Sequence, residues 1–263
     1  QSLVEKHIIS PEFASSKDEN CAILINDEEN ICIMINEEDH LRMQLFGEGI
    51  AIEELMNLAI EIDQKLERLV DYAFSEKYGY LTACPTNVGT GLRVSVMVHL
   101  PGLAETGNLN KILHIVNNFG MSVRGVYGEG SQSMGNMYQI SNNQTLGLTE
   151  QEIVKNMKLI TDKIIEQERV ARKYLGKNQI GLADKVYRAF GILENARILS
   201  SNECIDLLSD VKLGTDMGII SELDDTKIKK LFLYTKPANL QKYYGKVMDS
   251  NERDLKRTDV IRK

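Results

Sequence analysis

The sequence predicts an α+β fold in which an antiparallel sheet is flanked by helices and followed by a helical C-terminal region. Short apolar runs alternate with turn-like segments in the first part of the chain, which is typical of strands joined by hairpins. These runs do not alternate regularly with helices, so a parallel βαβ sheet is not expected. Later in the chain the apolar residues recur at helical spacing. We therefore divide the chain into regions 1–147 and 148–263.

The first predicted elements are a hairpin, a helix and two strands. The runs "CAILIN" (21–26) and "ICIMIN" (31–36) are separated by the polar stretch "DEEN" and predict a β-hairpin. Residues 51–77 place apolar side chains three or four positions apart, which predicts one long amphipathic helix. The stretches "YGYLTACP" (78–85) and "RVSVMVHL" (93–100) predict two strands, joined by a Gly-rich connection.

A second helix and two more strands follow. Residues 103–119 have helical apolar spacing, and Gly120 is placed as a C-terminal stop. The stretches "MSVRGVY" (121–127) and "NMYQIS" (136–141) are strand candidates on either side of the loop "GEGSQSMG" (128–135). The helical region then opens with Thr149 and Glu152 in the spacing of a capping box. Shorter helices with few strand signals are expected after this first helix.

Composition and charge limit the function classes. The chain has 263 residues, is 43% hydrophobic and carries a net charge of −7. This acidic balance does not favour direct nucleic-acid binding or an anionic membrane surface. No apolar run approaches the roughly 20 residues of a membrane helix, and the start of the chain has no secretory signal pattern. We therefore expect a cytoplasmic protein. The chain begins at Gln1, and we expect it to be a fragment or a processed product.

The cysteines and histidines do not predict a metal site. The four cysteines have no C-x-x-C spacing, and the four histidines show no paired spacing. The cysteines are expected to be free thiols. Three of them are expected to be small buried hydrophobes, namely Cys21, Cys32 and Cys204.

Charged or nucleophilic side chains lie at the ends of the predicted strands. If these strands share one sheet, one of its faces collects arginines, carboxylates and a thiol. Guanidinium groups match phosphate oxygens in shape and stay charged, so three arginines suit a polyphosphate. Each arginine taken alone is more often a solvated rim residue. The residues in question are Glu37, Glu38, Arg42, Cys84, Arg93, Arg124 and Glu129.

Taken together, these segments resemble the guanidino (phosphagen) kinases, and most closely the bacterial protein-arginine kinases. The resemblance rests on a set of motifs in the family's order and spacing. They are "LVEKHIIS" (3–10), "NEEDHLR" (36–42), "YLTACPTNVGTGLRVSVMVHLPGL" (80–103), "VRGVYGEG" (123–130) and "ISN" (140–142). The tail sequence "RDLKRT" (253–258) is similar to the R-D-x-x-R-A motif of the protein-arginine kinases, with Thr258 in place of the final alanine.

The resemblance implies roles around a substrate guanidinium. This group is a weak nucleophile because it is protonated up to a pH of about 12 or more, so a kinase must orient it and accept a proton from it. Glu38 matches the family's carboxylate base, with Glu37 beside it and Glu129 across the substrate. Cys84 matches the family's reactive cysteine beside the guanidinium. An acidic residue at position 129 favours arginine as the guanidine.

The resemblance also implies a nucleotide site. ATP would be the phosphoryl donor, and Mg²⁺ would be held mainly by the nucleotide, with no protein metal ligand. His7 matches an adenine-contacting histidine, and Arg42, Arg93 and Arg124 match phosphate-clamping arginines. The family's two nucleotide-binding loops correspond to Arg93, Val94, Ser95, Val96 and Met97 and to Arg124, Gly125, Val126, Tyr127, Gly128 and Glu129.

The tail and the partners follow from the same resemblance. Arg253, Asp254 and Arg257 would recognise phosphoarginine as an allosteric signal, although a charged, solvated helix end is the plain alternative. The implied partners are arginine-bearing protein substrates, a stress-response repressor and the Clp protease system, with a homodimer also considered. The family's S-S-R-I-R-like segment, which adds two phosphate arginines, has no match in this sequence, so weak or absent activity of this chain alone is expected.

The leading hypothesis is therefore an ATP-dependent protein-arginine kinase. A phosphagen kinase acting on free arginine and a non-catalytic phosphoarginine-binding module are the two alternatives. The helical C-terminal region favours the protein kinase over the free-arginine enzyme. Nucleotide binding would distinguish either kinase from the module.

Overall fold

The computed structural model describes residues 1–125 and 134–262. Within this part of the chain, the strands are β1 (Ala22–Ile25), β2 (Ile31–Ile35), β3 (Leu41–Leu45), β4 (Phe74–Ser75), β5 (Gly79–Tyr80), β6 (Ser95–His99), β7 (Met121–Gly125) and β8 (Met137–Asn142). The helices of the first region are α1 (Ser2–Glu5), α2 (Pro11–Ser15), α3 (Ile52–Glu67), α4 (Pro101–Glu105) and α5 (Leu109–Asn118). Short 3-10 turns cover Pro85–Asn87 and Met134–Asn136.

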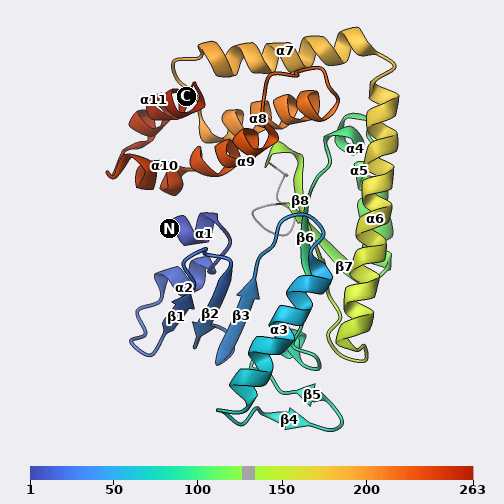
Figure 1. Ribbon diagram of the computed structural model, residues 1–263, viewed down its shortest axis with the longest axis vertical. Helices are drawn as coiled ribbons and strands as arrows, with labels where there is room; N and C mark the ends of the chain where they lie inside the picture. Colours follow the sequence, from blue (N-terminus) through green and yellow to red (C-terminus); the bar gives the residue numbers. More distant parts are fainter. Residues whose placement is uncertain (126–133, 263) are drawn as a thin grey trace.

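The C-terminal region is helical where the structure describes it. Its helices are α6 (Glu150–Leu175), α7 (Gln179–Asn195), α8 (Ser201–Asp216), α9 (Asp225–Tyr234), α10 (Pro237–Tyr244) and α11 (Ser250–Ile261). The capping box predicted at the start of α6 is confirmed, because Thr149 and Glu152 exchange side-chain to backbone hydrogen bonds of 2.8 and 3.2 Å. In Figure 1, α6 runs along one side of the molecule and α7 crosses its top.

All strand pairs in the described residues are antiparallel, which confirms the predicted sheet type. The strands form three separate sheets, in the orders β1-β2-β3, β4-β5 and β6-β8-β7. The expected 21–36 hairpin is confirmed as β1 and β2. The idea that all the predicted strands share one sheet is therefore wrong for the described part of the chain.

Several predicted elements differ in length from those observed. The helix predicted over 51–77 ends at Glu67, because Leu69 and Val70 are 80% and 45% exposed and find no core to pack against. The chain then forms the β4-β5 hairpin, where the rings of Phe74 and Tyr80 meet edge to face at 5.3 Å. The strand predicted over 78–85 is correspondingly reduced to Gly79–Tyr80.

The helix predicted over 103–119 is split into α4 and α5. Gly107 adopts a φ of +70° between them, a conformation that a helix interior does not contain. Leu103 and Leu109 are six residues apart, which departs from the 3.6-residue helical period and marks the break. The strand β3 was not predicted, because the charged turn before it and Arg42 within it obscure its alternation.

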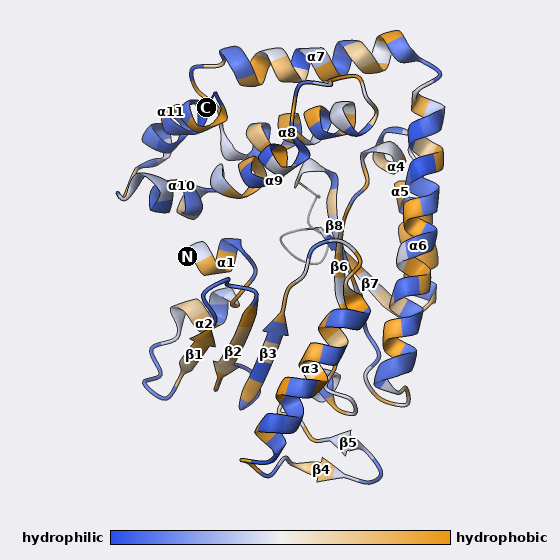
Figure 2. Ribbon diagram, viewed as in Figure 1, coloured by the Kyte–Doolittle hydropathy of each residue, from blue (hydrophilic) through white to orange (hydrophobic). Residues whose placement is uncertain are grey.

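The described residues form two large hydrophobic cores, and the first of them includes α6 of the region 148–263. One core lies between the sheet β6-β8-β7 and the helices α4, α5 and α6, with Leu100, Ile140 and Met157 almost fully buried. A second core joins α7, α8 and α9 around Val186, Leu208 and Leu213. Figure 2 shows the corresponding alternation of hydrophobic and hydrophilic residues along α6. None of the described helices is long and apolar enough to cross a membrane.

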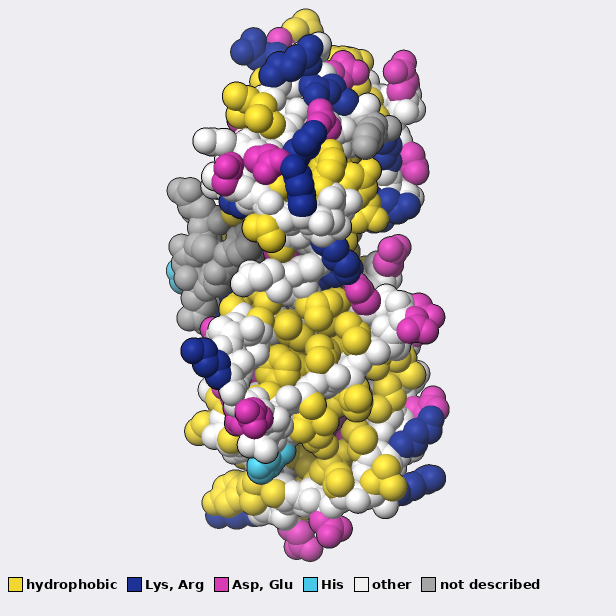
Figure 3. Space-filling model, turned by 90° about the vertical axis from the view of Figure 1, so that its left-hand side faces the viewer, with side chains coloured by type: hydrophobic (Ala, Val, Ile, Leu, Met, Phe, Trp, Pro, Cys, Tyr) yellow, Lys and Arg dark blue, Asp and Glu magenta, His cyan; other side chains and the backbone are white. Residues whose placement is uncertain are grey.

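The sheet β1-β2-β3 carries apolar side chains on both faces, although Arg42 and Gln44 of β3 share the face of Cys32 and Met34. On one face Cys32 and Met34 are fully buried and pack with Ile8 and Phe13 from the N-terminal segment. The other face is only partly covered; its side chains are Leu24, Ile31, Ile33, Ile35, Leu41, Met43 and Leu45. Figure 3 looks at the side of the molecule on which β1 lies and shows hydrophobic side chains gathered over the middle and lower parts of that side.

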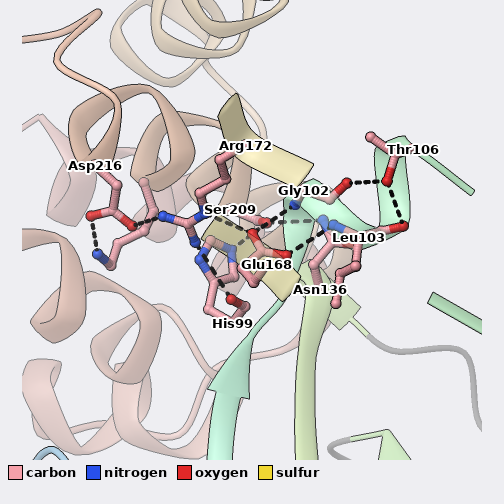
Figure 4. A network of polar contacts seen from close by, with 10 residues as sticks. His99, Gly102, Leu103, Thr106, Asn136, Glu168, Arg172, Ser209 and Asp216 are labelled. Atoms are coloured by element: carbon pink, nitrogen blue, oxygen red, sulfur yellow. Dashed lines mark hydrogen bonds and ion pairs between the residues drawn. The ribbon is translucent and has the colours of Figure 1, made fainter. Parts of the chain in front are cut away.

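A buried polar network joins the two regions (Figure 4). Glu168 on α6 accepts hydrogen bonds from the backbone N–H groups of Gly102 (2.8 Å) and Leu103 (2.9 Å), at the start of α4. Arg172 neutralises this carboxylate through its Nε at 2.6 Å and also reaches Asp216 of α8 at 2.8 Å. Glu168 thus satisfies the first amides of α4 and fixes that helix against α6.

His99, at the end of β6, extends this network to α8. Its Nε2 lies 2.8 Å from Oγ of Ser209, which also accepts a hydrogen bond from Asn136 Nδ2 at 3.1 Å. Burial, reinforced by the nearby Arg172 charge, lowers the pKa of His99 to about 3. The imidazole is therefore neutral at physiological pH and acts as a structural link between the sheet and the helical region.

The cysteines are free thiols, as expected. Cys32 and Cys204 are fully buried, in line with their expected packing role. Cys21 was also expected to be buried, but it is only partly so, because its Sγ donates a hydrogen bond to the backbone oxygen of Asn36 (3.0 Å) at the edge of a turn.

Candidate active site

The acidic stretch 36–40 forms a tight turn between β2 and β3. Asn36 begins the turn with a φ of +56°, a conformation that asparagine tolerates better than most residues. The backbone N–H of Asn36 donates to the carbonyl oxygen of His40 at 2.9 Å and closes the turn. Glu38 and His40 are exposed at its tip. The hairpin therefore presents Glu38 to solvent at the end of the sheet.

Glu37 points into the protein. Its side chain is 8% exposed and accepts hydrogen bonds from Arg42 Nη1 (2.9 Å), the Glu38 backbone N–H (3.0 Å) and Ser10 Oγ (2.6 Å). Burial alone would raise the pKa of Glu37, but these hydrogen bonds and the Arg42 charge together lower it. Glu37 therefore stays ionised and orients Arg42. Ser10 also ties the segment that carries His7 to this turn.

Cys84 lies on a loop that is fixed against the segment after β8. Oγ1 of Thr145 lies 2.9 Å from the carbonyl oxygen of Thr86 and 2.8 Å from that of Val88. A Cβ on Gly89, which has a φ of +111°, would lie 2.3 Å from the backbone oxygen of Thr145, so only glycine fits there. The Cys84 Sγ lies 3.0 Å from Thr86 Oγ1. This close approach holds the thiol in place.

The predicted arginines gather around Arg93, just before β6. The pKa of Arg93 is lowered by burial of its guanidinium and by the neighbouring charges of Arg124 and Arg42. The charges of Glu38 and Cys84 act in the opposite direction and raise the pKa of Arg93. Five side chains from four separate segments thus lie within electrostatic reach of one another. Because like charges are held together here, a bound polyanion would relieve their repulsion.

The first predicted nucleotide loop coincides with the start of β6. The backbone N–H of Val94 donates to Asn142 Oδ1 at 2.7 Å, which fixes the entry into the strand. Ser95 and Met97 are exposed on one side of β6, and Val94 and Val96 are partly buried and pack against the core. Arg124 and Gly125 end β7. Four residues of the second predicted loop, Val126, Tyr127, Gly128 and Glu129, lie outside the described residues.

His7 occupies the connection between α1 and α2. It has a φ of +61° and is exposed, and partial desolvation together with the charge of Lys236 at the start of α10 lowers the pKa of its imidazole. Lys236 in turn donates to the backbone oxygen of Glu5 at 2.9 Å. The Glu5 carboxylate accepts from the backbone N–H groups of Ala238 (2.7 Å) and Asn239 (2.9 Å). The segment bearing His7 is therefore held against the C-terminal region.

The tail residues have different surroundings. Arg257 is 1% exposed and donates to the backbone oxygens of Thr235 (2.8 Å) and Leu199 and to Asp254 Oδ1 (2.6 Å). Arg253 is partly buried and donates to the backbone oxygen of Met248 at 2.8 Å. Arg257 therefore links α11 to the end of α9 and to the segment before α8. Recognition of phosphoarginine by these residues stays a prediction.

The fold and the arginine-carboxylate-thiol cluster define a guanidino phosphotransferase of the phosphagen kinase class. Among solved structures, a taurocyamine kinase from Schistosoma mansoni superimposes with a TM-score of 0.56 at 26% identity, over 87% of this chain and 31% of that chain. A lombricine kinase superimposes with a TM-score of 0.52 at 31% identity, over 64% of this chain and 49% of that chain. The chain thus spans less than half of either enzyme.

Sequence comparison identifies the branch. Residues 1–171 match the family model "ATP:guanido phosphotransferase, C-terminal catalytic domain", and residues 179–263 match "Protein-arginine kinase McsB C-terminal domain". The chain is 53% identical over 99% of its length to a protein-arginine kinase of Halothermothrix orenii, of which it covers 74%. It is 47% identical over 99% of its length to one of Bacillus subtilis, of which it covers 71%. The chain therefore belongs to the protein-arginine kinase family, which confirms the resemblance inferred from its motifs.

Two features of the site escaped the sequence analysis. Thr145 holds the loop of Cys84 through two carbonyl oxygens, yet a lone threonine after a strand carries no distinctive signal. Asp39 stands in the motif "NEEDHLR" (36–42) but received no expected role. Its proximity in sequence to Glu38 could have indicated a role, but its partners became visible only in the folded chain.

Proposed function

We propose that this chain is the catalytic part of a protein-arginine kinase, which transfers the γ-phosphoryl group of MgATP to arginine side chains of proteins. The observation that carries the proposal is the cluster around Arg93, in which Arg42, Arg124, Glu38 and Cys84 all lie within electrostatic reach. The arginines of this cluster offer positive charge for phosphates, and its carboxylate and thiol offer partners for a guanidinium. A group of arginines alone, or a carboxylate beside a thiol alone, would be a common feature of a protein surface.

The carboxylate half suits the acceptor. Glu38 is exposed at the tip of its turn and can meet a substrate guanidinium, orient it by a charge-assisted hydrogen bond and accept the proton that leaves the nucleophilic nitrogen. Glu37 is engaged with Arg42 and Ser10, so its contribution is to position Arg42. Cys84 lies beside this cluster, and Glu129 is proposed as the opposing carboxylate.

The arginine half suits the phosphates. Phosphoryl transfer depends mainly on positioning and on neutralising phosphate oxygens. Arg42, Arg93 and Arg124 supply fixed positive charge, and His7 is proposed to contact the adenine. Within the described residues no three His, Cys, Asp or Glu side chains come together as metal ligands. Mg²⁺ is therefore proposed to be held by the phosphate oxygens, where it would neutralise their charge.

The helical region favours a protein as the acceptor. Residues 179–263 match the C-terminal domain model of protein-arginine kinases, and the curated relatives named above carry that name. We further propose a cytoplasmic setting, a link to a stress-response repressor and the Clp protease system, and allosteric control by phosphoarginine through Arg253, Asp254 and Arg257. A homodimer is part of the same proposal.

The direct test is incubation of the full-length protein that carries this chain with MgATP and an unfolded, arginine-rich protein. The expected product carries acid-labile phosphate on arginine, located by mass spectrometry under neutral conditions. Glu38→Gln should abolish this product, whereas the matched control Asp27→Asn, at an exposed position in the β1–β2 turn, should not. Phosphate found only on serine, threonine or tyrosine would refute the proposal.

Two parallel measurements separate the alternatives. Faster phosphorylation of free arginine than of the protein would favour a phosphagen kinase. Binding of phosphoarginine without any binding of MgATP would favour a non-catalytic module. The arginine cluster around Arg93 makes nucleotide binding the expected result.

A further inference from the structure

A single carboxylate joins the Glu38 turn to the Cys84 loop. Asp39 Oδ1 accepts a hydrogen bond from the backbone N–H of Ala83 at 2.6 Å. Its Oδ2 accepts a second one from Asn87 Nδ2 at 2.9 Å. The two donors flank Cys84 in sequence: Ala83 directly precedes it, and Asn87 is the last residue of the 3-10 turn Pro85–Asn87 that follows it. The Asp39 carboxylate therefore accepts a hydrogen bond from each end of the short segment that carries Cys84.

Asn87 also faces Glu38 and stabilises its own loop. Its Nδ2 lies 3.5 Å from Glu38 Oε2, at the limit of a hydrogen bond, and its backbone N–H donates to the Cys84 carbonyl oxygen at 3.0 Å. The side-chain amide of Asn87 thus lies between the carboxylate of Glu38, which is the proposed base, and the carboxylate of Asp39, which holds the Cys84 loop. Charge-assisted hydrogen bonds such as those accepted by Asp39 are roughly twice as strong as neutral ones.

The opposite side of the Cys84 loop is held separately. Thr145 contacts the carbonyl oxygens of Thr86 and Val88, and these contacts come from the segment after β8. Thr145 therefore fixes the loop to the sheet β6-β8-β7, whereas Asp39 ties it to the sheet β1-β2-β3. The two sheets share no strand pairing in the described residues. Their relative position at the site depends on side-chain bridges such as Asp39.

We propose that Asp39, paired with Asn87, is a positioning residue that sets the spacing between Glu38 and Cys84. This inference rests on the proposed function, because it gives these two groups a shared substrate. Asp39 itself does not take the proton, since its two oxygens are occupied by Ala83 and Asn87. A displacement of reacting groups by about 1 Å can cost about 100-fold in rate.

The test compares four variants of the whole chain with the wild type. Asp39→Ala and Asn87→Ala each remove one partner, and the double variant removes both. The exchanged pair Asp39→Asn with Asn87→Asp restores the hydrogen bonds, because the new amide can accept from Ala83 and donate to the new carboxylate. It also places a carboxylate beside Glu38, so this pair is compared only by the alkylation of Cys84. Asp27→Ala, at an exposed position in the β1–β2 turn, is the matched control.

Two readouts are measured for each variant, apart from the exchanged pair, for which only the second is compared. The first is steady-state phosphorylation of an arginine-rich protein, with kcat separated from the KM for MgATP. The second is the alkylation rate of Cys84 by iodoacetamide, followed by mass spectrometry with the partly buried Cys21 as an internal reference. The alkylation readout does not depend on kinase activity, so it tests the Asp39 bridge even if the proposed function fails.

The expected pattern is specific to positioning. Asp39→Ala should lower kcat by about 100-fold with the KM for MgATP unchanged, and it should raise the alkylation rate of Cys84 because the loop loses an anchor. The double variant should lose no more than Asp39→Ala, since the partners act together, and the exchanged pair should return the alkylation rate of Cys84 towards that of the wild type. Unchanged kcat and unchanged alkylation in Asp39→Ala, relative to Asp27→Ala, would overturn the proposal.

Discussion

Replacing the buried Arg257 by alanine should strongly destabilise the C-terminal region. The side chain is 1% exposed and donates to the backbone oxygens of Thr235 and Leu199 and to the carboxylate of Asp254. These contacts join α11 to the end of α9 and to the segment preceding α8. A charged guanidinium thus fills a buried position between helices, where an apolar side chain is more usual.

The magnitude follows from what the substitution leaves behind. Two buried carbonyl oxygens lose this donor, at about 1–3 kcal/mol each, and Asp254 loses its cation. The Asp254 side chain is 25% exposed and regains water when its cation is removed, so this loss adds little. The two carbonyl oxygens therefore set the expected effect of Arg257→Ala, a loss of about 2–6 kcal/mol in the free energy of unfolding. Arg253→Ala removes one hydrogen bond, to Met248, and should cost only about 0.5–1.5 kcal/mol.

Urea denaturation followed by far-ultraviolet circular dichroism at neutral pH measures both variants against the wild type. Hydrogen exchange would locate the loss in α8, α9 and α11. Equal stabilities of Arg257→Ala and Arg253→Ala would refute the reasoning, because Arg257 would then contribute no more than a partly exposed arginine. Loss of phosphoarginine binding with stability retained would show that Arg257 serves recognition instead of packing.

Three further predictions concern the site and its supports. Glu38→Gln should lower kcat by about 10²–10⁴-fold without changing the unfolding midpoint in urea, because Glu38 is exposed; an unchanged kcat would exclude it as the base. His99, with its pKa lowered to about 3, stays neutral in the fold but takes up a proton in the unfolded chain below pH 6.5. Stability should therefore fall with decreasing pH from 6.5 towards 3, by up to about 1.4 kcal/mol per pH unit, and His99→Gln should flatten that slope. Gly89→Ala should cost more than about 1 kcal/mol and speed Cys84 alkylation, since its Cβ would meet Thr145; an unchanged thermal midpoint would contradict this.

Local sequence signals predicted the elements that depend on neighbouring residues. The β1-β2 hairpin follows from two apolar runs around a polar turn, and the start of α6 follows from Thr149 and Glu152. Both depend on hydrogen bonds between residues close in sequence, so propensity and spacing suffice. The predictions were wrong where packing decided the outcome, as at the end of α3 and in the division of 103–119 into two helices.

The site was predictable as a set of residue types but not as an arrangement. Motif order along the chain supplied Glu38, Cys84, Arg42, Arg93 and Arg124 as candidates. Their gathering was expected on one sheet, whereas the structure brings them together from two sheets and a loop. No local sequence pattern predicts this arrangement, because the contacts that hold the site together join residues about 45 to 60 positions apart in the chain. Examples are Asp39 with Asn87 and Thr86 with Thr145.

The sequence by itself determined the family, the fold class and the reactive groups that are present, since these depend on which residues occur and in what order. Only the tertiary structure decided how the acids are used. Glu37 turns inward to hold Arg42, Glu38 faces solvent, and Asp39 binds the Cys84 loop. Three consecutive carboxylates look alike in sequence. They differ in the fold because burial and long-range hydrogen-bond partners act on each of them separately.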